Sequence, residues 1–526
     1  MKILFISIDL TMGTRILVNI LKNSGFQARN LQITGIRYSD SISQKTLKQI
    51  YEFAKEYNIV GLAFNSFYSV LASQIGRYLK SKGIKFLITG GPHPTAAPEE
   101  PLDYSDLSVI YEAEITLPKI MENLRSGLPL DTVGGLVFKD RGGRLINTGR
   151  PRVENNLDNL PFPSISAEDI VYYDFKKSSF LSPGVNNLFP HSGKNYFIMT
   201  SRGCPFDCAY CCNNLFARLD RAFARVRKRS IPNIIEEMER AKKAGFEGFF
   251  IADDNFFAFT PEEIESFSGL YKSRINLPFG IGGLNPNNMR QGSSPKKIDL
   301  LLECGLSDIR IGVQSGSNKT LKIFKRNYTT EELPGLTKVL ENRKTIWPEP
   351  HRKLRVAADF ICDSPWEKAD DKLDTLKLAN KLLDTYGIFF YTLIYLPGTD
   401  IYAMAVKNGW VKDRERDVYL RGIAGVEDNI YNRLLFLIAV LKERGGRVPD
   451  EVIEHVLKVH RKDPSLSYKL IDFVMHTVNS IEDHYSLGKK GHLTIHPYLK
   501  GFNKWEKKSG EKGKKVLFRS YHEAYG

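Results

Sequence analysis

The stretch from Tyr196 to Asn214 reads Y-F-I-M-T-S-R-G-C-P-F-D-C-A-Y-C-C-N-N and decides how the rest of the chain is interpreted. Its first residues are apolar and predict a short strand over 196–200. The loop that follows carries Cys204, Cys208 and Cys211, whose C-x3-C-x2-C spacing allows three thiolates to point into one hollow. Three thiolates do not complete a structural zinc site, which takes four ligands. They do suit a 4Fe–4S cluster in which one iron has no protein ligand.

The residues around the three cysteines agree with a cluster site. Three of the chain's six cysteines fall in this loop, so incidental packing explains the spacing poorly. With Arg202-Gly203 before the first cysteine and Tyr210 before the third, the loop resembles the signature of the radical S-adenosylmethionine (radical SAM) superfamily. In that family the open iron binds the amino and carboxylate groups of S-adenosylmethionine, which is cleaved reductively to a 5′-deoxyadenosyl radical. The resemblance implies that Tyr210 lies beside this cofactor.

Composition places the chain among soluble globular proteins of several domains. Its 526 residues predict two to four domains, and 42% hydrophobic and 26% charged residues are ordinary values. No run of about twenty apolar residues predicts a membrane span, and Asp9 interrupts the only stretch that could be mistaken for a signal peptide. Six cysteines without a paired framework indicate a reducing compartment. We therefore expect a cytoplasmic protein.

The net charge of +15 is concentrated near the end of the sequence. Residues 500–519 contain eight Lys or Arg against Glu506 and Glu511. Such a segment is either a solvated basic tail or a contact for an anionic partner, including an acidic membrane surface. Charge alone does not indicate nucleic-acid binding.

Strands alternate with helices over residues 1 to about 125. Strands are expected at 3–8, 27–33, 59–64, 85–89 and 107–111. Helices are expected between them, for example at 14–24, 43–57 and 68–82. This alternation predicts a doubly wound parallel sheet, whose ligands bind at the carboxyl ends of the strands. Polar and glycine-rich residues gather at those ends, whereas the G-x-G-x-x-G fingerprint of dinucleotide binding is missing.

The G-G-P-H-P-T-x-x-P-E-E pattern at residues 90–100 resembles the cobalamin-binding domain of many radical SAM enzymes. The resemblance implies a cobalamin site at the strand ends of this domain. Its candidate residues are Thr11, Gly13, Ser66, Gly90, Gly91, Pro92 and His93.

One departure concerns the cobalt ligand. Cobalamin domains that supply a histidine use D-x-H-x-x-G after the first strand, and here Thr11 stands in the place of that histidine. Threonine offers no imidazole nitrogen, so we infer cobalamin bound without a histidine ligand and without its own base. His93 is either within reach of the cofactor or a turn histidine packed against the sheet.

Residues 131–194 are expected to be a hairpin, over 134–146, followed by a linker that could pass over the active site. From Tyr196 the alternation resumes for six rounds, with strands at 196–200, 247–252, 278–283, 308–313, 355–361 and 388–395. Helices are expected at 231–244, 261–275, 296–304, 330–343, 369–386 and 400–408. Six rounds suit the partial (β/α)6 barrel of the radical SAM superfamily, with its chemistry at the carboxyl ends of the strands. Domain boundaries are therefore expected at 1–130, 131–194, 195–409 and 410–526.

Three strand ends of this barrel carry candidate site residues. Either Asp253 or Asp254 is expected to bind the amino group of S-adenosylmethionine, because carboxylates are good acceptors for an ammonium group, while the other caps the next helix. Gln314 and Ser315 resemble the family's G-x-E-S-G-S motif and imply contacts to its ribose or carboxylate, although a serine here could equally be a helix cap. Cys362 and Asp363 replace a glycine-bearing stretch of the relatives. Cys362 is then a catalytic hydrogen donor, a substrate contact or a small core residue.

The region 410–526 shows helical periodicity at 431–444, 449–460 and 467–481, and no motif. Its apolar stripes and basic residues suggest a small or lipid-like substrate with an anionic group, held between the barrel mouth and this segment. Cys212 and Cys304 are expected to be packing residues.

The sequence thus predicts an α/β protein: a doubly wound cobalamin-binding domain, a partial (β/α)6 radical SAM barrel and a mostly helical carboxyl-terminal region. Its expected cofactors are a 4Fe–4S cluster, S-adenosylmethionine and cobalamin, with an external electron donor of the flavodoxin or ferredoxin type. The expected activity is methylation of an unactivated carbon. A cyclase or ring-rearranging enzyme, like the magnesium-protoporphyrin ester cyclase group, is the main alternative. An RNA methylthiotransferase is a distant one, because nucleic-acid binding is not otherwise indicated.

Overall fold

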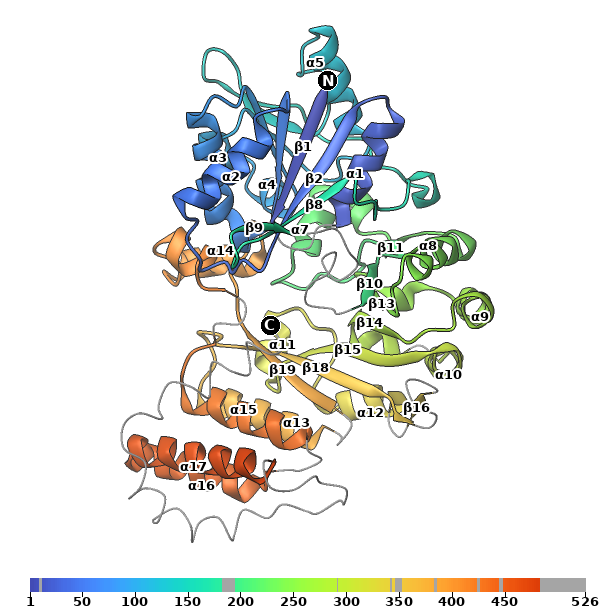
Figure 1. Cartoon of the computed structure of the whole chain (residues 1–526). Coiled ribbons are helices and arrows are strands. Elements are labelled where there is room, and N and C mark those ends of the chain that lie inside the picture. The colour runs from blue at the N-terminus through green and yellow to red at the C-terminus, as the bar shows by residue number, and fades with distance from the viewer. Residues whose placement is uncertain are drawn as a thin grey trace.

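Two large sheets flanked by helices form the frame of the protein, one mixed with a parallel core and one parallel throughout (Figure 1). The computed structural model describes residues 1–8, 12–181, 194–290, 292–340, 343–345, 352–382, 386–422, 426–443 and 448–482. Thr11 and the basic segment at 500–519 lie outside these residues. The predictions made for them are therefore not tested.

The first sheet has the expected doubly wound core. Its parallel strands are β1 (Lys2–Ile8), β2 (Gln27–Thr34), β3 (Ile59–Ala63), β4 (Phe86–Gly90) and β5 (Leu107–Val109). They lie in the order β5-β4-β3-β1-β2. This order reverses beside β1, which is the topological switch point where such sheets bind ligands.

Helices cover both faces of this sheet because side chains alternate along β1. Leu4 and Ile6 pack with one apolar cluster, which includes residues of α2 (Gln44–Ala54) and α3 (Ser69–Ser81). Ile3 and Phe5 pack with another, which includes residues of α1 (Met12–Asn23) and α5 (Thr116–Ser126).

Additional strands extend both edges of the first sheet. The expected hairpin is present as β6 (Leu136–Lys139) and β7 (Leu145–Asn147), antiparallel to β5. At the other edge, β8 (Ile170–Asp174) pairs parallel to β2, and β9 (Ser179–Leu181) pairs antiparallel to β8. The expected linker at 164–194 is therefore wrong over these strands. The buried side chains of Ile170, Tyr172 and Tyr173 stabilise β8 as part of the sheet.

The second sheet is the expected partial barrel of six parallel strands in chain order. Its strands are β10 (Asn195–Ile198), β13 (Gly248–Ile251), β14 (Phe279–Leu284), β15 (Leu306–Gln314), β18 (Arg355–Cys362) and β19 (Tyr386–Thr392). Helices α8 (Ile231–Lys243), α9 (Pro261–Leu270), α10 (Ser294–Cys304), α13 (Ala369–Lys381) and α14 (Asp400–Lys407) lie close to the predicted positions.

Two helices of the barrel differ from the prediction. The helix expected over 330–343 is only the short α12 (Leu333–Thr337), continued by a 3-10 turn, and α11 (Asn318–Ile323) lies before it. Glycine at position 335 lowers helix stability here. The helix expected to reach residue 386 ends at Lys381, because β19 begins at Tyr386.

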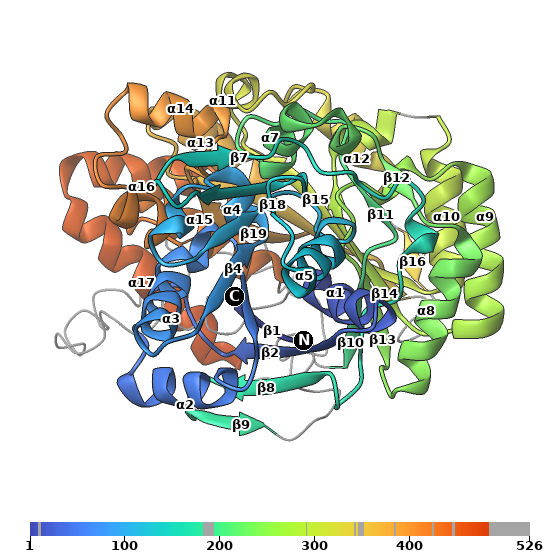
Figure 2. The same ribbon diagram turned by 90° about the horizontal axis from the view of Figure 1, so that it is seen from above.

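The carboxyl-terminal helices are α15 (Ile430–Glu443), α16 (Asp450–Lys462) and α17 (Pro464–Glu482), as predicted. Helix α15 packs beside α13 and β19, at the far end of the barrel sheet from β10, and α16 and α17 pack against α15 (Figures 1 and 2). Within the described part of the chain, no helix is long and apolar enough to cross a membrane.

Candidate functional site

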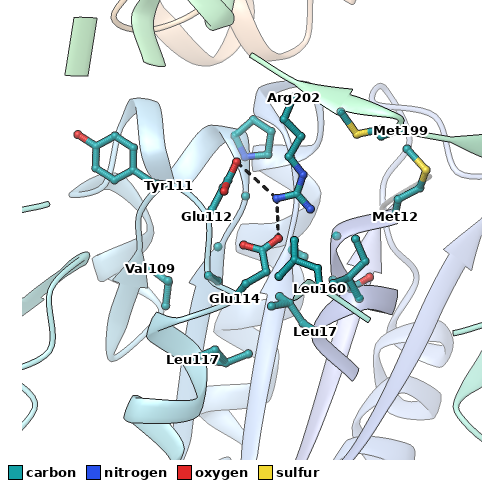
Figure 3. Close-up of a pocket in the computed structure, with 18 of the residues that line it drawn as sticks. Met12, Leu17, Val109, Tyr111, Glu112, Glu114, Leu117, Leu160, Met199 and Arg202 are labelled. Carbon is teal, nitrogen blue, oxygen red and sulfur yellow. Dashed lines mark hydrogen bonds and ion pairs between the residues drawn. The ribbon is translucent and has the colours of Figure 1, made fainter. Parts of the chain in front are cut away.

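A cavity of about 500 Å³ lies where the strand ends of the first sheet meet the start of the barrel (Figure 3). Its walls come from β1, β3, β4 and β5 of the first domain and from the loops after β10 and β13 of the second. Among the predicted cobalamin residues, Gly13, Gly90, Gly91 and Pro92 line it. The switch point of the doubly wound sheet and the residues on either side of the three cysteines, Gly203 and Asn213, thus border one space, while the cysteines themselves do not line it.

The first-domain wall fits a large, mostly apolar ligand. Apolar side chains line much of the cavity, among them Phe5, Leu17, Val109 and Leu117, and Gly91 also borders it. Gly91 has φ 106°, and a Cβ there would lie 2.8 Å from the carbonyl oxygen of Phe64. Only glycine fits where these two segments of the chain approach each other so closely. This apolar wall with its glycine-rich segment would suit cobalamin.

His93 and Ser66 do not line the cavity. His93 Nδ1 lies 3.1 Å from the Ser66 hydroxyl, and Nε2 lies 3.5 Å from the carboxylate of Glu100. The imidazole is fully buried against the rings of Phe64 and Tyr419. Both ring nitrogens are thus directed at protein partners, which favours the packing role of this histidine over cobalt ligation.

The cysteine loop is held by its backbone. Cys204 N donates to the Phe223 carbonyl at 3.3 Å, and Cys211 N donates to the Cys208 carbonyl at 3.1 Å. Gly203 has φ 96°, and a Cβ at this position would lie 2.3 Å from the Arg225 carbonyl oxygen. As their side chains stand, no three His, Cys, Asp or Glu residues of the described chain are grouped to hold a metal ion. The cluster therefore remains a prediction from the spacing of the cysteines.

Two thiols of the loop, those of Cys204 and Cys211, have shifted pKa values with different causes. Burial raises the pKa of the Cys204 thiol to about 12, and the nearby Cys211, Asp254 and Cys208 add to the effect. A hydrogen bond with Cys212 instead lowers the pKa of Cys211. A metal cation bound at Cys204 would replace the thiol proton and hold this residue as a thiolate.

Arg326 is a site residue that the sequence did not reveal. Its guanidinium donates to the sulfur of Cys208 at 3.2 Å, to the Tyr210 hydroxyl at 3.3 Å and to the Gly312 carbonyl at 2.7 Å. The side chain is more than nine-tenths buried. The guanidinium of Arg326 is thus fixed beside Cys208, a predicted cluster ligand, and a guanidinium binds anionic groups such as a thiolate or a carboxylate. Tyr210, which belongs to the cysteine loop, thus contacts Arg326 through its hydroxyl, and its place beside S-adenosylmethionine stays a prediction.

Asp253 and Asp254 have different partners. Asp253 is buried and accepts hydrogen bonds from the backbone and hydroxyl of Thr200 and from the hydroxyl of Ser201 at 2.7 Å. Burial raises the pKa of Asp253 to about 6. Asp254 lines the cavity and accepts from Gly203 N at 3.0 Å and from Asn213 Nδ2 at 2.7 Å. Asp254 is therefore the better candidate for a ligand contact, and neither carboxylate caps a helix.

Gln314 and Ser315 occupy the end of β15 in a strained turn. Gln314 has φ 72°, which non-glycine residues rarely adopt. The Ser315 hydroxyl donates to Glu367 at 3.2 Å, and burial raises the pKa of that carboxyl to about 7. Ser317, rather than Ser315, caps α11 by accepting from Thr320 N. Backbone strain of this kind is often kept at ligand sites.

Cys362 lies among core residues. It lies on the same face of β18 as the buried Val356, Ala358 and Phe360, and it packs with the main apolar cluster. It does not line the cavity, and burial raises the pKa of its thiol. This placement favours packing over hydrogen donation. Cys304 is also buried in this cluster, as expected.

The comparison with known families agrees with this geometry. The Radical SAM superfamily matches residues 198–344, which include the cysteine loop and the strands β13 to β15. These residues are thus similar to a radical SAM domain. Joined to the doubly wound sheet, this domain gives the chain the overall fold of cobalamin-dependent radical SAM enzymes.

Two protein sequences and one solved structure are similar to this chain over most of its length. An uncharacterized methyltransferase of Pyrococcus horikoshii is 26% identical over 329 residues, which span 61% of this chain and 63% of that protein. Cytidylyl-2-hydroxyethylphosphonate methyltransferase of Streptomyces wedmorensis is 23% identical, over 72% of this chain and 73% of its own. The cobalamin-dependent S-adenosylmethionine radical enzyme OxsB, solved with aqua-cobalamin and S-adenosylmethionine bound, superposes with a TM-score of 0.59 at 15% identity. That alignment covers 96% of this chain and 78% of OxsB.

Proposed function

We propose that the protein is a cobalamin-dependent radical SAM methyltransferase acting on an unactivated carbon. The observation that carries this proposal is the shared cavity, which the glycine-rich strand ends of the first domain and the residues on either side of the three cysteines both border. Two relatives named as methyltransferases support the reaction type.

The residues that would hold the cofactors follow from the site. Cys204, Cys208 and Cys211 would bind the 4Fe–4S cluster. Asp254 would accept from the amino group of S-adenosylmethionine, and Gln314 would contact the same cofactor. The cavity wall at Gly13 and Gly90–Pro92 would carry cobalamin. When bound, the cluster and S-adenosylmethionine supply hydrogen abstraction from carbon, and cobalamin supplies the methyl group, while the protein places them.

The expected partners are a small-molecule substrate and an external electron donor of the flavodoxin or ferredoxin type. The proposed lipid-like character of the substrate depended on the basic segment outside the described residues, so no contact here supports it. An RNA methylthiotransferase is disfavoured. Such enzymes resemble one another in three further cysteines of the first domain and a carboxyl-terminal RNA-binding domain of strands. Residues 1–195 contain no cysteine, and the described residues after 429 form helices.

Anaerobic turnover with candidate substrates tests the reaction type. Methyl transfer to carbon should produce S-adenosylhomocysteine and 5′-deoxyadenosine together, because one S-adenosylmethionine remethylates cobalamin and a second supplies the radical. Deoxyadenosine and a converted substrate without S-adenosylhomocysteine would instead establish the cyclase or rearrangement alternative.

We expect His93→Ala to leave the axial coordination of cobalamin unchanged. Both imidazole nitrogens face protein partners, Ser66 and Glu100, and the ring does not line the cavity. The electron paramagnetic resonance spectrum of the cob(II)alamin form should therefore lack nitrogen hyperfine splitting from an axial imidazole in both proteins. Splitting that is present in the wild type and lost in the variant would identify His93 as the ligand.

A further inference from the structure

Four charged side chains form a buried network beside the cavity, and three of them, Glu112, Glu114 and Arg202, line its wall (Figure 3). Glu112 and Glu114 follow β5 of the first domain, and Arg202 and Arg227 belong to the paired strands β11 (Ser201–Arg202) and β12 (Arg227–Lys228) of the second. Arg202 Nη1 lies 2.7 Å from Glu114 Oε1 and 3.4 Å from Glu112 Oε1. Arg227 Nη1 donates to Glu112 Oε2 at 3.0 Å.

The network connects the two domains next to the cysteine loop. Arg202 is separated from Cys204 only by Gly203, and both carboxylates come from the other domain. Ion pairs removed from water are maintained only by good geometry and complete hydrogen bonding. The network thus fixes the start of the loop against the first domain.

One carboxylate of the network is incompletely paired. Both oxygens of Glu112 have an arginine partner. Glu114 Oε1 accepts from Arg202, but Glu114 Oε2 is shielded from water and has no hydrogen-bond partner among the described residues. A buried carboxylate oxygen without a donor is unfavourable, because the desolvation of the charged group is not offset by a hydrogen bond. A donor supplied by a bound ligand would remove this penalty.

The position of Glu114 identifies the chemistry of that donor. The residue lines the cavity assigned above to cobalamin, and the last torsion of a glutamate side chain is broad, so the carboxylate can turn towards the cavity at low cost. A corrin ring carries carboxamide side chains on its rim, and their N–H groups are donors. We propose that Glu114 accepts a hydrogen bond from one ring carboxamide of cobalamin, while Arg202 holds its other oxygen. This inference rests on the proposed function.

Cobalamin derivatives in which one ring carboxamide is hydrolysed to the carboxylic acid test this contact without turnover. The full-length protein with its cluster reconstituted is titrated with hydroxocobalamin and with each monoacid, and dissociation constants are measured by absorbance. The wild type should bind one monoacid at least tenfold more weakly than cobalamin, because two carboxylates would face each other. In Glu114→Gln the difference should fall to about twofold or less, because the amide can donate to the acid.

Two variants control for charge and position. Glu112→Gln changes a carboxylate whose oxygens are both engaged, and Glu122→Gln changes an exposed one on α5. Both should keep the tenfold discrimination. Should Glu114→Gln fail to fold, Glu114→Asp, which keeps the charge but retracts it, should reduce the discrimination instead.

Equal binding of every monoacid by the wild type, or full discrimination in the folded Glu114 variant, would overturn the contact. A wild-type protein that binds no cobalamin would instead overturn the proposed function. The two failures are therefore distinguishable.

Discussion

Cys208→Ala is expected to reduce cleavage of S-adenosylmethionine to background. A cluster with an open iron needs three protein thiolates, and Cys208 is the buried member of the three, in hydrogen-bond contact with Arg326. Removing one thiolate should therefore prevent stable cluster assembly. The measurement is 5′-deoxyadenosine formed under strong reductant, together with iron and sulfide bound per chain after anaerobic reconstitution.

Cys304→Ala is the matched control for the loss of one thiol. Cys304 is fully buried at the end of α10 and packs in the barrel core, away from the cysteine loop. Its replacement should destabilise the fold by about 1 kcal/mol and leave cleavage largely intact. Cluster-dependent cleavage that persisted in Cys208→Ala would refute the assignment of the cluster ligands.

Most of the fold could be predicted from local patterns in the sequence. The alternation of strands and helices predicted both parallel sheets, because buried parallel strands read as continuous apolar runs and their connecting helices as amphipathic segments. Strand β8 was missed because Ile170–Asp174 is short and stands between proline- and serine-rich segments, so only its pairing with β2 makes it a strand.

Contacts between distant segments explain what the sequence could not show about the site. Glu112 and Arg227 are 115 positions apart, and Arg326 and Cys208 are 118 apart, so no local spacing connects them. Cys362 illustrates a different limit. Its place at a strand end suggested a site residue, but side chains alternate along a strand, and its face is that of the buried Phe360. The alternation of buried and less buried residues along β18 would have predicted that Cys362 lies in the core.

Asp253 and Asp254 illustrate how neighbouring carboxylates at one strand end acquire different roles. Successive side chains leave a strand in opposite directions. Asp253 is therefore enclosed by Thr200 and Ser201, at the end of β10, while Asp254 reaches Gly203 in the cysteine loop and the cavity. The two residues should then respond differently to mutation.

Asp253→Ala is expected to destabilise the protein by about 3 kcal/mol or more. The change leaves the backbone N–H of Thr200 and two hydroxyl groups without their acceptor in a buried position, and each lost partner is unfavourable by roughly 1–3 kcal/mol.

Asp254→Asn should instead fold normally, because the amide oxygen can still accept from Gly203 N. It should bind S-adenosylmethionine about tenfold or more weakly, since a charge-assisted hydrogen bond to the ammonium group is lost. Thermal unfolding and equilibrium dialysis of S-adenosylmethionine against reconstituted protein measure the two effects. Unchanged affinity for S-adenosylmethionine in Asp254→Asn, together with lost affinity in a stably folded Asp253→Ala, would instead identify Asp253 as the residue that binds this cofactor.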